Sequence, residues 1–430
     1  MKIFGLMGST ALAIILTCGA AIAADVAAPT QNWTGLHIGI GAGYGMDDHA
    51  LSLDVPGIPL TASLDGLAGE GVLGTIEAGY DVQLNDQYVV GIQADYTRTG
   101  INTSLDFAGS SIYNISPVSN ASLMLRAGQV VDGSTLVYVT GGWTHSWFES
   151  NLNIGAPTSM NAETNGITFG GGVESAISDN LTAKIEYRYS HFGDISLIDG
   201  GGLFDLSSQP DVQTVRAVLS YHGGDVHSYQ GGFDQGSWTG LHVGLAGGVG
   251  LVNHELSVVG FPASLSGIGG RGILGSAEVG FDYQLGERFL VGLQGDYTRS
   301  GMATSFNLAF GGGSIDYSLA ATDSFSVLGR MGLLASPNVL WYGEGGWTHT
   351  TFDGNLAVTG SPPLAYQYGA DGLTLGAGVE AKINDHLSWK TDYRYTSYNT
   401  VDFLSGLGIA GLLNSDTNVQ TIRTAISYRF

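Results

Sequence analysis

Hydrophobic and polar residues alternate with a period of two along several stretches of this chain. The clearest stretch covers residues 89–98, and the same alternation recurs in residues 74–82 and 181–190. Because successive side chains of a β-strand point to opposite faces, each stretch predicts a strand with one apolar and one polar face. No strongly periodic helical segment appears beyond the N-terminus, so the chain is expected to be all-β. In residues 89–98 the apolar face holds Val90, Ile92, Ala94 and Tyr96.

The chain contains an internal duplication. The segment NWTGLHIGIGAGYG, which starts at Asn32, returns as SWTGLHVGLAGGVG from Ser237, and further matches follow at shifts of 201 to 207 residues. A repeat of this length is a whole domain rather than a solenoid unit. The shift changes only within four long polar or Gly-rich stretches, while three short connections keep their length. Four variable loops and three tight turns predict eight strands per copy. The variable stretches are residues 46–70, 99–118, 150–163 and 195–210.

Composition and the N-terminus indicate an exported protein. Charged residues make up 12% of the chain, against about 25% in a typical soluble domain, and 68 of 430 residues are Gly. Residues 1–23 are expected to be a signal peptide, with a basic Lys2, an apolar run and the small residues AIA before the cleavage site. The only cysteine, Cys18, lies within it, so no disulfide is expected in the mature chain. No later segment has eighteen consecutive apolar residues, which argues against a transmembrane helix.

The polar faces of the expected strands carry balanced charge. Each copy has four acidic and four basic residues there, and the only change between matched positions is Glu186 to Asp392. One interpretation is a solvated face of salt bridges. We favour a charge network inside a narrow barrel, where pairing is needed because an unpaired buried charge costs several kcal/mol. The expected network is Glu77, Asp95, Arg126, Glu174, Lys184, Glu186, Arg188 and Arg216 in the first copy, and Glu278, Asp296, Arg330, Glu380, Lys390, Asp392, Arg394 and Arg423 in the second.

The apolar faces would then point outward. A soluble barrel turns its apolar face inward, whereas a membrane barrel turns it toward lipid, and the balanced charges favour the membrane arrangement. Strands of about twelve residues tilted near 40° are long enough to cross the apolar slab. Aromatic residues near the strand ends suit a belt at the level of the lipid headgroups. This belt is expected to include Tyr80, Tyr88, Tyr96, Trp143, Trp147, Tyr187, Tyr189 and Tyr221.

The C-terminus adds a family resemblance. The chain ends in TAISYRF, with Tyr428 and Phe430 as its last aromatic residues. This ending resembles the signal by which the barrel-assembly machinery recognises outer-membrane barrels. Together with NWTGLHIGIGAGYG, EYRYSHFG and DYRYTSYN, it makes each copy similar to the small outer-membrane β-barrel family of alphaproteobacteria, within the OmpA-like group. The resemblance covers nearly all of the mature chain. It implies eight-stranded up-and-down barrels with short periplasmic turns and longer surface loops, in the outer membrane of a Gram-negative bacterium.

Two architectures remain open at this point. The expected parts are an N-terminal periplasmic segment (24–32), a first barrel repeat (33–222), a Gly-rich linker (223–237) and a second barrel repeat (238–430). Two tandem eight-stranded barrels would use the linker as a flexible tether, and one sixteen-stranded barrel would use it as a long turn. The duplicated charge network favours two barrels, because its members would lose their partners across a wide pore. The single aromatic ending favours one barrel.

The sequence argues against several kinds of site. His145 and His349 fall on the lipid-facing side, and no set of Ser, His and acid is retained across the copies, so no catalytic residue is expected. No Cys or His cluster has metal spacing and no helix follows the Gly-rich stretches, so neither a metal nor another cofactor is expected. The formal net charge of −23 argues against nucleic acid binding. Arg98 and Arg299 occupy matched rim positions, where they either contact lipopolysaccharide phosphates or simply snorkel.

The resulting prediction is a non-enzymatic, surface-exposed outer-membrane protein that supports envelope integrity and surface interactions. Its expected partners are outer-membrane lipid and lipopolysaccharide. A general diffusion porin made of one sixteen-stranded barrel is the alternative. An outer-membrane rim enzyme is less favoured, and a soluble ligand-binding barrel is less favoured still.

Overall fold

The computed structural model describes most of the chain beyond residue 31. The predicted signal peptide with Cys18, and all of the predicted periplasmic segment except Asn32, lie outside the described residues. Within them, no helix is long and apolar enough to cross a membrane. The described ranges are 32–55, 57–107, 110–131, 133–153, 158–199, 205–224, 226–229, 231–233, 237–258, 264–402 and 413–430.

Strands make up nearly all of the described structure. The first repeat contains β1 (Gly35–Val55), β2 (Leu60–Gln83), β3 (Tyr88–Thr99), β4 (Thr103–Phe107), β5 (Ser110–Val131), β6 (Thr135–Leu152), β7 (Thr158–Ser178), β8 (Leu181–Phe192), β9 (Ile195–Asp199) and β10 (Asp205–His222). The second contains β11 (Gly240–Val258), β12 (Ser264–Leu285), β13 (Phe289–Phe310), β14 (Gly313–Ser336), β15 (Val339–Val358), β16 (Leu364–Lys382), β17 (Leu387–Tyr398), β18 (Val401–Asp402) and β19 (Leu413–Arg429).

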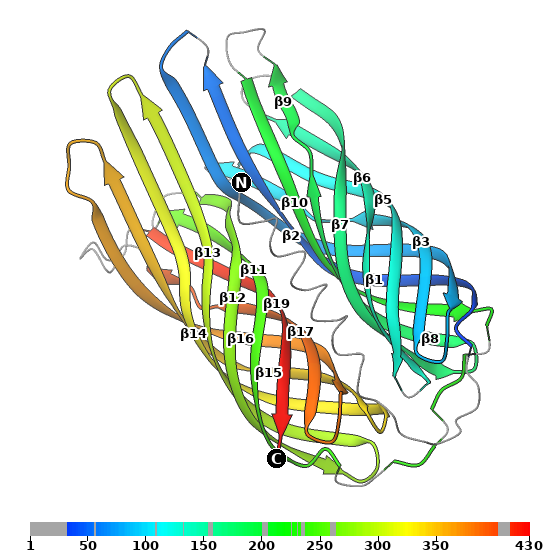
Figure 1. Cartoon of the computed structure of the whole chain (residues 1–430). Helices are drawn as coiled ribbons and strands as arrows, with labels where there is room; N and C mark the ends of the chain where they lie inside the picture. The colour runs from blue at the N-terminus through cyan, green and yellow to red at the C-terminus, as the bar shows by residue number, and fades with distance from the viewer. Residues whose placement is uncertain are drawn as a thin grey trace.

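Each repeat forms its own closed ring of antiparallel strands, and the two rings stand side by side (Figure 1). Strands that follow one another along the chain pair in order. The last strand then pairs with the first, β10 with β1 and β19 with β11. The short strands β4, β9 and β18 continue β3, β8 and β17, so the described residues of each ring form eight members. The prediction of an all-β, antiparallel fold is confirmed. We call the rings barrel 1 and barrel 2.

One end of each barrel extends far beyond the ring. The β1–β2 ladder continues to Val55 and Leu60, although residues 46–70 were expected to be a loop. The β13–β14 ladder likewise reaches Phe310 and Gly313. An antiparallel ladder pairs its own backbone groups, so it persists in a Gly- and Ser-rich sequence that reads as a loop. The hairpins project from one end in Figure 1. We call this the hairpin end, and the opposite end, with the short connections, the turn end.

Apolar side chains cover the outside of the barrels. On β2, Ile76 is 58% exposed, whereas the adjacent Glu77 is 5% exposed and points into the barrel. Strand alternation repeats this division around both rings, which is the arrangement of a lipid-facing barrel. Tyr80 and Trp143 of the expected aromatic belt are exposed on this surface. Tyr187 departs from the expectation, because it faces barrel 2 rather than lipid.

The described part of the linker packs against the barrels instead of forming a free tether. Val226 is fully buried in a cluster with Trp33 and Tyr138 at the turn end of barrel 1. The backbone amide of Asn180 donates to the Val226 carbonyl at 2.8 Å. Further along, Phe233 packs against the corresponding cluster of barrel 2. The expectation of a flexible linker did not include these contacts. The segment is mostly polar and Gly-rich, and its two packed apolar residues, Val226 and Phe233, do not stand out in it.

Candidate functional site: the barrel interiors

Ion pairs fill the middle of barrel 1. Arg126 on β5 contacts the carboxylates of Asp81 and, at 2.8 Å, Glu174. Lys184 on β8 reaches Glu77 on β2 at 2.5 Å. These five side chains are at most 5% exposed. Because each pair joins strands that are not neighbours, the contacts cross the interior. Each of these buried charges is therefore compensated by an opposite charge rather than by solvent.

A second group of charges lies closer to the hairpin end of barrel 1. Arg188 binds Asp95 and Glu186, in both cases with an N–O distance of 2.6 Å. Arg216 approaches the same two carboxylates at 3.3 and 3.8 Å. Asp95 therefore bridges two guanidinium groups. Sharing carboxylates in this way compensates closely packed like charges, which an isolated pair could not do.

Barrel 2 repeats this arrangement. All sixteen residues of the expected network lie inside the barrels, eight in each, and none is more than 6% exposed. Arg423 again shares a carboxylate with a second arginine, because it lies 3.5 Å from Asp296. The main pairs are Arg330 with Asp282 (3.0 Å) and Glu380, Lys390 with Glu278 (2.5 Å), Arg394 with Asp296 (2.7 Å), and Arg423 with Asp392 (2.8 Å).

The interior contains charges that the sequence reasoning missed. Asp81 and its counterpart Asp282 are fully buried partners of the central arginines. Both fall on the polar faces of their strands, so the alternation alone could have identified them. Glu344 and Arg429 are charged only in barrel 2. A search for charges retained in both copies cannot find such residues.

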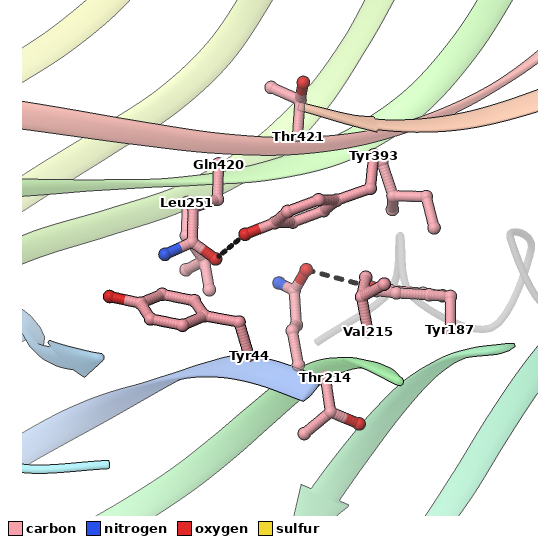
Figure 2. Close-up of a pocket in the computed structure, with 10 residues that line it drawn as sticks. Tyr44, Tyr187, Thr214, Val215, Leu251, Tyr393, Gln420 and Thr421 are labelled. Atoms are coloured by element: carbon pink, nitrogen blue, oxygen red, sulfur yellow. Dashed lines mark hydrogen bonds between the residues drawn. The ribbon is translucent and has the colours of Figure 1, made fainter. Parts of the chain in front are cut away.

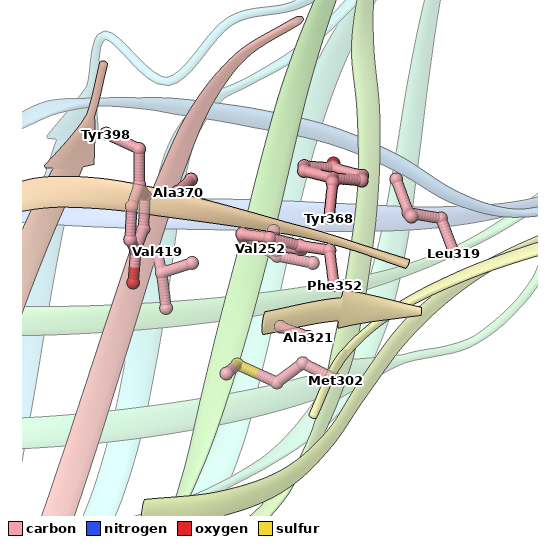
Figure 3. Packing of buried hydrophobic residues seen from close by; sticks show 9 residues of the cluster. All are labelled: Val252, Met302, Leu319, Ala321, Phe352, Tyr368, Ala370, Tyr398 and Val419. Carbon is pink, nitrogen blue, oxygen red and sulfur yellow. The ribbon is translucent and has the colours of Figure 1, made fainter. Parts of the chain in front are cut away.

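Both ends of each interior are closed. At the turn end, Trp33 and Trp238 are fully buried, and their indole N–H groups donate to the carbonyls of Gly133 (3.2 Å) and Pro337 (2.8 Å). At the hairpin end of barrel 2, an apolar cluster contains the stacked rings of Phe352 and Tyr368 (Figure 3). Barrel 1 has its own cluster, formed by Leu67, Tyr113, Ile115, Phe148 and Ile195.

One set of residues in barrel 1 has the composition of a hydrolytic triad. His49 lies 2.9 Å from Ser208 Oγ and 3.0 Å from Asp47 Oδ2. All three residues are at most 1% exposed, and Thr103 also donates to Asp47 at 2.5 Å. A nucleophile must reach its substrate, and the buried Ser208 hydroxyl has no access to one. We interpret this set as interior packing that satisfies polar groups.

The remaining predicted residues lie on the outer surface. Arg98 and Arg299 are exposed near the hairpin ends, and Arg299 lies 3.5 Å from Asp323. Tyr428 and Phe430 are 40% and 66% exposed at the turn end, with their rings 5.0 Å apart. His145 packs against Trp147 on the outside of barrel 1, with a ring separation of 4.5 Å. Among the described residues, no group of three or more His, Cys, Asp or Glu could hold a metal ion.

A closed antiparallel ring with an apolar exterior and a charged interior defines an integral β-barrel membrane protein. The chain belongs to the outer membrane protein beta-barrel domain family, whose sequence model matches residues 10–222 and again 226–430. The predicted family and the internal duplication are therefore confirmed. Membership places the protein in the outer membrane of a Gram-negative bacterium.

Known relatives correspond to about half of the chain. The 31 kDa outer-membrane immunogenic protein of Brucella melitensis is 33% identical over 212 residues, which cover 46% of this chain and 88% of the relative. The 25 kDa outer-membrane immunogenic protein of Brucella abortus is 23% identical over 201 residues, covering 45% and 81%. Among solved structures, the attachment invasion locus protein Ail of Yersinia pestis aligns with a TM-score of 0.25 at 17% identity, covering 45% of this chain and 99% of Ail.

Proposed function

We propose that this protein is a structural, surface-exposed component of the outer membrane that conducts no solutes and catalyses no reaction. The observation that carries the proposal is the filling of each barrel along its whole length. A buried tryptophan closes the turn end, ion pairs occupy the middle, and apolar side chains close the hairpin end. An eight-stranded ring has room for these side chains and little else.

The energetics of the filled interior support a permanent plug. Opening a path for ions would require breaking contacts such as Arg126 with Glu174, and removing one partner from a buried pair costs about 3–5 kcal/mol. The network of each barrel contains several such contacts that share carboxylates. A transient pore would therefore break many contacts together.

The hairpin ends are the surfaces through which such a protein would act. The β1–β2 and β13–β14 hairpins project well beyond the rings (Figure 1). The relatives in Brucella are named outer-membrane immunogenic proteins, which supports exposure of the hairpin ends outside the cell. Interactions at this surface would support envelope integrity.

Single-channel recording on the refolded mature protein in a planar bilayer, at high salt and free of native porins, tests the proposal. Protein shown to be folded is expected to give no long-lived conductance steps. The matched double variant Trp33→Ala with Trp238→Ala removes the plugs at the turn end but keeps the ion pairs, and it is expected to stay silent as well. Large, reproducible steps from the native chain would instead indicate a diffusion porin with one wide lumen, the candidate favoured by the single aromatic ending at Phe430.

A further inference from the structure

The two barrels meet through the same face. Around a small cavity between them, Tyr187 of barrel 1 donates to Gln213 at 2.9 Å, and the matched Tyr393 of barrel 2 donates to Gln420 at 2.7 Å. Figure 2 shows the two sets approaching from opposite sides. A contact in which equivalent residues of two subunits face each other is isologous, as in a two-fold dimer. The duplicated chain therefore resembles a covalently joined dimer.

Equivalent residues also meet towards the turn end of the contact. The matched Val173 and Val379 are each 3% exposed and belong to one apolar cluster that spans both barrels. Trp341 of barrel 2 donates to the Ser175 hydroxyl of barrel 1 at 3.2 Å. At the hairpin end, β2 residues 61–65 pair with β13 residues 305–309. Since the strands are tilted, different strands form this contact at different heights.

One pair of matched positions at this contact carries opposite charge. Glu70 on β2 corresponds to Arg271 on β12. Glu70 accepts a hydrogen bond from Gln420 of barrel 2 at 3.0 Å. Arg271 contacts the carboxylate of Asp211 in barrel 1 and lies 3.7 Å from Asp48. Each of these two residues thus reaches across to the other barrel.

The surfaces that Glu70 and Arg271 face also differ in charge between the two barrels. Barrel 2 has neutral Asn253 and Asn418 where barrel 1 has Asp48 and Asp211. If two copies of barrel 1 met through this face, Glu70 would meet two carboxylates. If two copies of barrel 2 met, Arg271 would meet none. Only the pairing of barrel 1 with barrel 2 places the arginine on the acids and the glutamate on a neutral donor.

We propose that the exchange of Glu70 for Arg271, together with the acids at Asp48 and Asp211, specifies pairing of the two barrels within one chain. The same charges exclude association of barrel 1 with barrel 1 of another chain through this face, because like charges brought together oppose wrong partners. The protein is thus a self-contained barrel pair. This inference does not depend on whether either barrel conducts.

Cysteine cross-linking in the full-length protein tests the pairing. Val215 and the matched Ile422 line the cavity between the barrels, and the only native cysteine is Cys18 in the predicted signal peptide. The test protein carries Val215→Cys, Ile422→Cys and a protease site in the linker, and it is treated with a bis-maleimide reagent. If the two barrels are in contact, the reagent joins them, and they run as one band after the linker is cleaved. With the native charges, most chains are expected to be cross-linked and therefore to stay in one band after cleavage. Arg271→Glu is expected to lower the cross-linked fraction at least about tenfold, since like charges replace an ion pair.

Two matched variants make the result specific to the charges. Arg299→Glu, which reverses an exposed arginine on the neighbouring strand β13, is expected to leave cross-linking unchanged. Arg271→Glu combined with Asp211→Arg is expected to restore it. A chain with Val215→Cys alone is expected to form few cross-links to other chains, and more when Asp48, Asp211 and Glu70 are all made neutral. Native-level cross-linking in Arg271→Glu, or abundant cross-linking between chains that carry native charges, would overturn the proposal.

Discussion

Barrel 1 and barrel 2 pair the same four cations with matching carboxylates, but among the described residues the network of ion pairs in barrel 2 contains one more acid and one more base. Arg429 stands where barrel 1 has His222, and Glu344 stands where it has Thr140. Arg429 donates to Asp282 at 2.8 Å, and Glu344 accepts from Arg394 at 2.6 Å. The two substitutions lie at different heights but keep the sum of charge in this network unchanged.

The difference teaches how a closed interior can diverge. A single new charge in this network would be left without a counter-charge in a low-dielectric space, so an acid and a base are expected to be gained there together. Outside the network, barrel 1 has the buried Asp47 where barrel 2 has Val252, and Asp47 is bonded to His49 and Thr103 instead. The two need not touch, because the network joins them through shared carboxylates. Charge balance therefore constrains the network as a whole rather than each pair.

The largest expected effect comes from removing the central arginine of each barrel. Arg126→Met leaves Asp81 and Glu174 with the histidines His37 and His222, so a loss of about 3–5 kcal/mol is expected. Arg330→Met should be milder, because Arg429 lies 2.8 Å from Asp282 and 3.5 Å from Glu380. Urea unfolding of the refolded full chain, followed by tryptophan fluorescence, measures both variants. Equal losses would show that Arg429 does not act as a substitute partner.

A smaller effect is expected from making barrel 2 resemble barrel 1 at one position. Glu344→Thr removes one carboxylate from Arg394, which keeps Asp296 at 2.7 Å. The loss should be about 1–3 kcal/mol, the cost of an unsatisfied hydrogen bond to a charged group. The reverse change, Thr140→Glu in barrel 1, adds an acid without a base and should also destabilise. If Thr140→Glu stabilised the protein in the same unfolding assay, the charge-balance argument would fail.

Much of the fold could be predicted because strand alternation is a local signal. Glu77 and Ile76 are adjacent in sequence and face opposite sides of the wall, so their roles follow from position alone. The duplication supplied a second sequence for each strand, in which the same alternation could be checked. It also separated the loops from the strands, except where the β1–β2 ladder runs on through residues that look like a loop.

What the sequence could not predict depends on contacts between distant segments. Trp33 precedes the first strand and looks like a membrane-surface residue, yet it closes the interior because the β5–β6 turn offers it the Gly133 carbonyl. The exposed-looking Tyr187 faces barrel 2. Comparison of the copies does show that Glu70 and Arg271 are matched residues of opposite charge. Only the structure shows that each of them contacts the other barrel.

The stability of the folded chain should also depend on pH. Asp48 lies beyond the roughly 9–11 residues of β1 that span the membrane, and burial raises its pKa to about 6, opposed by Arg271. Asp47, Asp65 and His49 also act on it. An acid whose pKa is raised on folding stabilises the folded state when it is protonated, so the free energy of unfolding should fall by about 1–3 kcal/mol as pH rises from 4 through 6, and then level off. Urea unfolding of the full chain at pH 4 and pH 8 measures this fall, and Asp48→Asn should abolish it.

The smallest effects should come from the two rim arginines, and they distinguish the barrels once more. Arg299 lies opposite Asp323, whereas Arg98 lies opposite the neutral Ser119. Replacing either by alanine should change stability by less than about 1 kcal/mol, because both side chains are exposed. If lipopolysaccharide phosphates bind here, Arg98→Ala should weaken binding to lipopolysaccharide vesicles more than Arg299→Ala, since Asp323 already neutralises Arg299. Asp323→Ser should then bring the binding contribution of Arg299 up to that of Arg98. Vesicle binding that is unchanged in all three variants would assign both arginines to the snorkelling role alone.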